Sequence, residues 1–164
     1  MRVDGWEDRL RSYLLDHQDT PFSYGSFDCL SFAAGAAHSI TGVDIMARFR
    51  GQYGTHLGAM RIARRVYGCR TVPDVLAEMM HEHGWLEVSP AFAQRGDIVL
   101  VAINDDLIVG VLHPNGREAV ITTNQGLWRV PLASVRRAWK VQCPKVSSHL
   151  SQAQESSRLE SRSM

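Results

Sequence analysis

The sequence predicts one α+β domain in which helices come first and a small antiparallel sheet follows. Apolar residues recur at helical spacing over much of residues 5–84, and short strand-like segments separated by turn signals occupy residues 97–141. Helices followed by strands indicate an α+β fold rather than alternating βαβ units. A length of 164 residues suits a single domain with its own core.

Two helices are expected in the N-terminal part of the chain. Residues 5–17 carry apolar side chains near helical spacing, and Pro21 follows, which pushes its preceding residue out of the α region. A second helix follows Asp28, a good N-cap, and ends at Gly42. Because this second helix is rich in alanine and contains Gly35, we expect another element to pack very close to it.

Two further helices are expected before residue 85. One covers roughly residues 56–67, and the other starts at Thr71, has a proline in its first turn and stops at Gly84. The inward side of the 56–67 helix is expected to hold Leu57, Met60, Ala63 and Val66. Its outward side holds Arg61, Arg64 and Arg65, which we interpret as a solvated or partner-contacting face rather than a nucleic-acid site.

After Trp85 the spacing of apolar residues changes from a helical to a strand-like pattern, and a set of short antiparallel strands is expected. The predicted strands are 97–102, 107–112, 117–122, 127–130 and 138–141, with turns at 104–106 and 113–116. Trp128 and Trp139 lie on these segments, and we expect them to be core or interface anchors.

Composition and charge argue against several classes of function. The net charge of +1 gives no global reason to expect binding to nucleic acid. No apolar run approaches the roughly 20 residues of a membrane-spanning helix, and the charged N-terminal segment has no signal-peptide pattern. Three widely spaced cysteines favour a reducing compartment, and we expect no metal or cofactor. We assign residues 1–145 to the domain and the polar residues 146–164 to a flexible tail.

Cys29 is the first candidate for chemistry. It follows the N-cap Asp28, so it falls in the first turn of a helix, where unsatisfied N–H groups stabilise a thiolate. The thiolate is the nucleophile of cysteine hydrolases. The alternative is a packing role, since cysteine is among the residue types most often buried.

The surroundings of Cys29 resemble a known family. Residues 22–29, with an aromatic-Gly pair before Asp28-Cys29 and a small-residue helix after it, are similar to the nucleophile segment of NlpC-type peptidases. Residues 95–100 resemble the Gly-Asp-apolar strand that opens the sheet of those papain-like proteins, and residues 109–111 resemble the next hairpin. The resemblance covers roughly residues 20–141. It points to a divergent branch found among the tail genes of tailed phages and gene-transfer particles.

The sequence departs from that family at the residues that handle protons. In active relatives a histidine just before the Val-Gly pair acts as the base, and this chain has Ile108 there. The orienting polar residue falls on Val120, and an aliphatic side chain cannot transfer a proton. His113 is the nearest substitute, but it lies about five residues further along at a turn, beyond a side chain's reach unless the register differs. The candidate catalytic residues are therefore Cys29, His113 and Asp28.

We assign no functional role to the remaining histidines. His17, His38 and His56 have no recognisable context, and we expect them at surface or boundary positions. His81 and His83 point to different faces of a helix end, so a metal pair there is not expected.

Three functions follow as hypotheses. The first is a structural protein of a phage tail tip or of tail assembly, with a degenerate NlpC-like fold, made in the host cytoplasm and carried in the virion. It would contact other tail proteins such as hub or distal-tail subunits. The alternative is an active cysteine endopeptidase that cuts cell-wall peptidoglycan peptides with Cys29. A third is a binding domain that holds a peptide or glycan between the Cys29 helix and strands 97–121.

Overall fold

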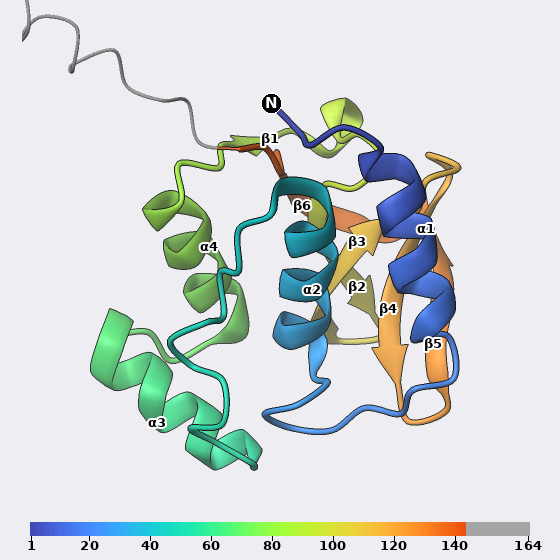
Figure 1. Cartoon of the computed structure of the whole chain (residues 1–164). Helices are drawn as coiled ribbons and strands as arrows, with labels where there is room; N and C mark the ends of the chain where they lie inside the picture. Colours follow the sequence, from blue (N-terminus) through green and yellow to red (C-terminus); the bar gives the residue numbers. More distant parts are fainter. Residues whose placement is uncertain (144–164) are drawn as a thin grey trace, which may run out of the picture.

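Helices pack against a six-stranded antiparallel sheet in the computed structural model, which describes residues 1–143 (Figure 1). The helices are α1 (Trp6–Asp16), α2 (Cys29–Thr41), α3 (His56–Tyr67) and α4 (Val72–Glu82), with short 3-10 turns at Pro90–Phe92 and Leu132–Ser134. The strands are β1 (Glu87–Val88), β2 (Ile98–Ile103), β3 (Asp106–Leu112), β4 (Glu118–Thr123), β5 (Gly126–Pro131) and β6 (Val135–Trp139). The predicted α+β class is confirmed, and the expected tail at 146–164 lies outside the described residues.

The sheet is a meander with one strand that returns across it. Its order is β1-β6-β2-β3-β4-β5, so β2 to β5 follow one another as predicted, while β6 pairs with β2 on the other side. Trp139 of β6 faces both Ile98 of β2 and Glu87 of β1. The expectation of a strand over 138–141 starts too late, because β6 begins at Val135. None of helices α1 to α4 is long and apolar enough to cross a bilayer.

α2 is the central helix of the core, and its small residues allow close approach. A Cβ placed on Gly35 would overlap the hydroxyl of Tyr13 on α1. That hydroxyl donates a hydrogen bond to the carbonyl of Phe32 at 3.0 Å. The expectation of a closely packed neighbour for this helix is therefore confirmed, and the neighbour is α1.

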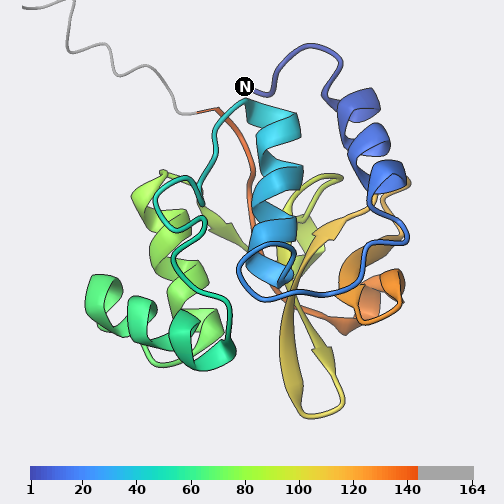
Figure 2. The same ribbon diagram turned by 60° about the horizontal axis from the view of Figure 1, so that its bottom comes forward.

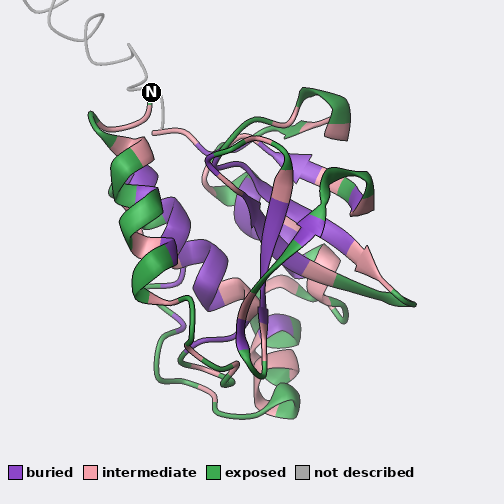
Figure 3. Ribbon diagram, turned by 90° about the vertical axis from the view of Figure 1, so that its right-hand side faces the viewer, coloured by how far each residue is buried: buried purple, intermediate pink, exposed green. Residues whose placement is uncertain are grey.

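α3 differs from the prediction on its inward side. Ala63 is buried, but Leu57 is 61% exposed and Val66 is 42% exposed, so the expectation that both point inward is wrong. Met60 and Ala63 line the cavity beside α3, whereas Leu57 and Val66 are not on its wall and face solvent. Figure 3 shows the contrast between the buried strands and the largely exposed outer helices. Trp128 is also exposed, at 60%, whereas Trp139 is a core residue as expected.

Asp97 is fully buried, and it binds both ends of the described chain. Its carboxylate accepts a hydrogen bond from Arg2 at 2.7 Å and forms an ion pair with Lys140 at 3.1 Å. The backbone N–H groups of Gln94 and Val141 donate to it at 2.8 and 3.2 Å. A buried carboxylate is tolerated only when it is paired and hydrogen-bonded in this way.

We expect Asp97→Ala to lower the free energy of unfolding by about 3 kcal/mol, because it leaves the cations of Arg2 and Lys140 without their shared partner. Urea denaturation measures the loss. Glu87→Ala is the control, since its ion pair with Arg137 is partly exposed and is expected to contribute less than about 1 kcal/mol. Equal losses in the two variants would contradict the role given to Asp97.

Candidate functional site

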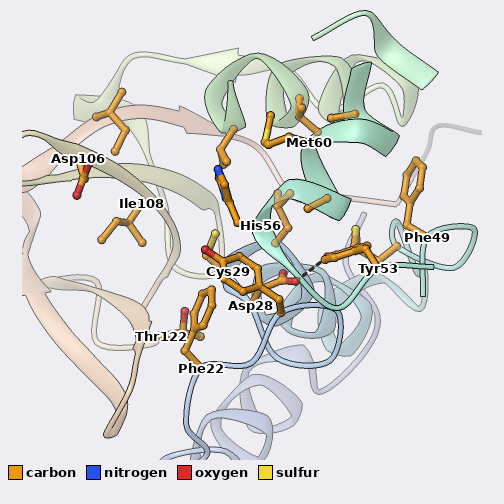
Figure 4. A pocket seen from close by; sticks show the side chains of 18 of the residues that line it. Phe22, Asp28, Cys29, Phe49, Tyr53, His56, Met60, Asp106, Ile108 and Thr122 are labelled. Atoms are coloured by element: carbon orange, nitrogen blue, oxygen red, sulfur yellow. Dashed lines mark hydrogen bonds between the residues drawn. The ribbon is translucent and has the colours of Figure 1, made fainter. Parts of the chain in front are cut away.

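The loop before α2 places Cys29 at the first position of that helix. The carboxylate of Asp28, which is the N-cap, accepts hydrogen bonds from the N–H of Ser31 at 2.8 Å and the N–H of Gly25 at 2.9 Å. The hydroxyl of Tyr53 donates to the same carboxylate at 2.6 Å (Figure 4). The predicted cap is confirmed. Because Asp28 is buried and accepts three hydrogen bonds, its role is to hold these segments together.

The thiol of Cys29 is in a setting that favours the protonated form. Burial raises its pKa to about 11, and the adjacent carboxylate of Asp28 acts in the same direction. Hydrogen bonds from the backbone of Val109, Leu30 and Cys29 itself lower the pKa by less than burial raises it. The helix N-terminus therefore does not make this thiol a thiolate at neutral pH, because desolvation outweighs the favourable backbone groups.

The two positions expected to handle protons lie in different surroundings. Ile108, on β3, lines the same cavity as Cys29. Val120, on β4, is buried in the main core. The residues of β4 that do line the cavity are Ile121, Thr122 and Thr123. The hydroxyl oxygen of Thr122 is buried with no hydrogen-bond partner within residues 1–143.

His113 does not share the site with Cys29. It follows β3 and lines a separate cavity of about 370 Å³, together with Leu14 of α1 and Val120. Its Nδ1 accepts a hydrogen bond from the N–H of Asn115 at 3.0 Å, and burial lowers its pKa. The structure thus brings Asp28 and Cys29 together and leaves His113 in a hairpin turn elsewhere.

His56 is the histidine that lines the Cys29 cavity, and residue spacing alone does not reveal it. It is the first residue of α3, and its ring lies 5.8 Å from the ring of Tyr24 between centroids. Figure 4 shows its side chain over the same hollow as Cys29. The side chain of Thr55, which caps α3, is a sequence signal that fixes where this helix begins. Among the described residues, the hydrogen bonds that act on the thiol come from backbone groups and none comes from an imidazole.

The cavity is large and mostly apolar. Its volume is about 760 Å³, and its walls come from the start of α2, from α3 and α4, and from β3 and β4. This is within the range of roughly 300–1,000 Å³ that ligand pockets have. The acidic residues on its wall are Asp28 and Asp106, and within residues 1–143 no lysine or arginine lines it.

The cavity opens where two neighbouring strands separate. β3 and β4 pair at Val111 with Val120 and at the next residue pair, while β3 continues along β2 and β4 continues along β5. Figure 2 shows the β2–β3 hairpin leaning away from β4 and β5. If the pairing continued, Val109 would face Thr122. Instead the thiol of Cys29 lies against the backbone of Val109, and the hydroxyl of Thr122 has no partner.

The chain belongs to a family described as a domain of unknown function (DUF6950), which matches residues 1–141. The matched region contains each described helix and strand and the whole wall of the Cys29 cavity. Among curated proteins, none matches the chain.

We expect Asp28→Asn to lower the pKa of Cys29 below about 11, because it removes the neighbouring negative charge while an amide oxygen still accepts from the N–H of Ser31. The rate of iodoacetamide alkylation at pH 8 should rise, as measured by mass spectrometry of the peptide that contains Cys29. Asp106→Asn is the matched control, since Asp106 lines the cavity without acting on the thiol. A rate for Asp28→Asn no higher than that of the control would show the charge to be irrelevant.

Proposed function

We propose that this protein is a non-catalytic structural component of a phage tail tip or of tail assembly, built on an NlpC-type scaffold. The observation that carries the proposal is the state of Cys29: its pKa is raised to about 11, and its hydrogen bonds come from backbone groups rather than from an imidazole. Ile108 stands on the cavity wall where the base is expected. An enzyme of this class needs a thiolate and a base within hydrogen-bond reach.

The arrangement of the elements supports the NlpC-type part of the proposal. The segments that carry the resemblance, at 22–29 and 95–111, lie far apart in sequence. They meet in space, because the thiol of Cys29 lies against the backbone of Val109 and α2 packs on β3. A cavity lies at this junction of helix and sheet, as a substrate cleft would. On this proposal, the chain differs from active relatives in side chains at the site rather than in the arrangement of its helices and strands.

The surface supports a role in contacts between proteins. Leu86 and Phe92 are exposed large apolar residues, and both lie beside Lys140, whose backbone and side chain bond to their carbonyls. Trp128 is exposed on β5, the strand at the edge of the sheet. Such residues mark interaction surfaces more often when they occur together than singly. The link to phage tails rests on the sequence resemblance to the tail-associated branch.

We expect the thiol of Cys29 to react slowly with iodoacetamide at pH 7 and to gain rate with pH up to a midpoint near 11. N-acetylcysteine, with an unperturbed pKa of about 8.5, is the reference thiol, and a Cys29→Ser variant confirms the assignment of the labelled peptide. An apparent pKa below that of the reference would indicate a poised nucleophile and would contradict the proposal.

The proposed role in the particle is tested separately. We expect mass spectrometry to detect the protein in purified tailed particles from cells that carry its gene. We also expect particles assembled with Cys29→Ala to be as infective as the wild type, because no step needs the thiol. Absence of the protein from intact particles would overturn the proposal.

An active endopeptidase that cuts peptidoglycan peptides is the second candidate. One observation favours it: His56 lines the same cavity as Cys29. In that case His56 would accept the thiol proton and the thiolate would attack the peptide carbonyl. The C–N bond would break as His56 returned the proton to the leaving amine, and water would then hydrolyse the thioester and restore the thiol. Release of peptides from purified peptidoglycan would then be lost in Cys29→Ala and in His56→Ala, and kept in His113→Ala, whose side chain lines the other cavity. We expect the wild-type protein to release none.

A further inference from the structure

We propose that the cavity beside Cys29 is a docking groove for an extended segment of a partner protein, which adds as a strand to the open edge of β3. The segment would place apolar side chains beneath α3 and a lysine or arginine against Asp106. This inference rests on the proposed function, since it names the chemistry of the partner that a non-catalytic tail protein would hold in this site.

One edge of β3 is open beyond the point where the strands separate. On one side β3 pairs with β2 from Asp106 to Val111, but on the other it pairs with β4 at Val111 and Leu112. The N–H of His113, just after β3, donates to the carbonyl of Glu118 at the start of β4. Because backbone groups alternate along an antiparallel strand, odd-numbered residues of β3 direct theirs toward the side of β4.

Leu107 and Val109 are the odd-numbered residues that lie beyond the paired region. The backbone of Val109 lies against the thiol of Cys29 and lowers its pKa. The carbonyl of Val109 and both backbone groups of Leu107 have no backbone partner in the described part of the chain. Leu107 also lines the cavity, so these groups border it. An open strand edge is a template for an added strand, and this mode of binding is common in peptide recognition.

α3 presents an apolar face to the same space. Met60, Ile62, Ala63 and Tyr67 line the cavity, yet Ala63 is the buried residue of this helix. A 12-residue helix depends on tertiary packing of its apolar face for most of its stability. Apolar side chains of a docked segment would cover this face and so would stabilise α3.

The charges on the wall indicate what the segment carries. The carboxylate of Asp28 is already bonded to three groups, whereas Asp106 is exposed and has no ion-pair partner among residues 1–143. A lysine or arginine on the segment would neutralise Asp106, while a ligand with a carboxylate head would be repelled. These features favour a basic, apolar peptide over a fatty acid.

The test uses the full chain labelled with ¹⁵N and the blocked peptide acetyl-Leu-Lys-Leu-Thr-Leu-Lys-amide. NMR titration is expected to give saturable shifts of the amides of Leu107, Val109 and α3. Replacing both lysines of the peptide by glutamate should weaken binding roughly tenfold. Asp106→Lys should reverse this preference, whereas Asp105→Lys, the matched control in the adjacent exposed turn, should leave it within about twofold.

Backbone methylation of the peptide separates strand addition from simple apolar binding. Alternate N–H groups of an added strand point toward β3, and the others point away from it. Methylation of the nitrogens that point toward β3 should abolish binding, whereas methylation of the others should leave binding unchanged. The proposal is overturned if the peptide causes no shifts, if both methylated sets bind alike, or if sodium palmitate binds in place of the peptide. It is also overturned if the same amides shift with protein concentration alone, since a second copy would then fill the groove.

Cleavage of the peptide distinguishes this inference from the function on which it rests. If the peptide binds at Leu107 and Val109 and is then cut, and Cys29→Ala prevents the cut, the docking groove is supported and the non-catalytic function fails. If the peptide is neither bound nor cut, the docking groove fails while the inert thiol of Cys29 stands.

Discussion

The carboxylate of Asp28 is the contact on which the site depends. It fixes the start of α2, holds the turn at Gly25 and receives the hydroxyl of Tyr53 from the segment that leads to α3. It therefore determines where Cys29 lies relative to β3. The same charge helps to raise the pKa of the thiol, so the contact that builds the site also keeps its sulfur protonated. The position of the sulfur and, together with burial, its raised pKa thus both depend on Asp28.

Much of the fold can be predicted because helix boundaries are local. Asp28 and Thr55 cap helices, and Gly42 and Gly68 end them in the left-handed conformation, so each of these helices is fixed by residues within one turn of its ends. The pairing of β6 with β2 cannot be predicted from local sequence, because pairing between distant segments leaves no periodic pattern of residues. β1 has two residues, which is too short for any pattern.

The residues of the candidate site also differ in whether local sequence signals identify them. Cys29 is identifiable from sequence because its position follows from a local cap. His56 is not identifiable in this way, because it lines the cavity only through the position of α3 in the fold. The spacing of residues along a helix does not show where that helix packs. Leu57 and Val66 show the same limit, since an apolar pattern predicts a face and not how fully the face is covered. The separation of β3 from β4 is likewise a property of the sheet rather than of either strand's residues.

The two ends of the described chain lie together at the opposite end of α2 from Cys29. The N–H of Cys143 donates to the carbonyl of Met1 at 2.7 Å, and the thiol of Cys143 donates to the carbonyl of Thr41. A circular permutant, with a short linker between residues 1 and 143, would keep the contact of Met1 with Cys143 and the ion pairs of Asp97. New termini cut into the exposed 104–105 turn would then emerge beside the groove.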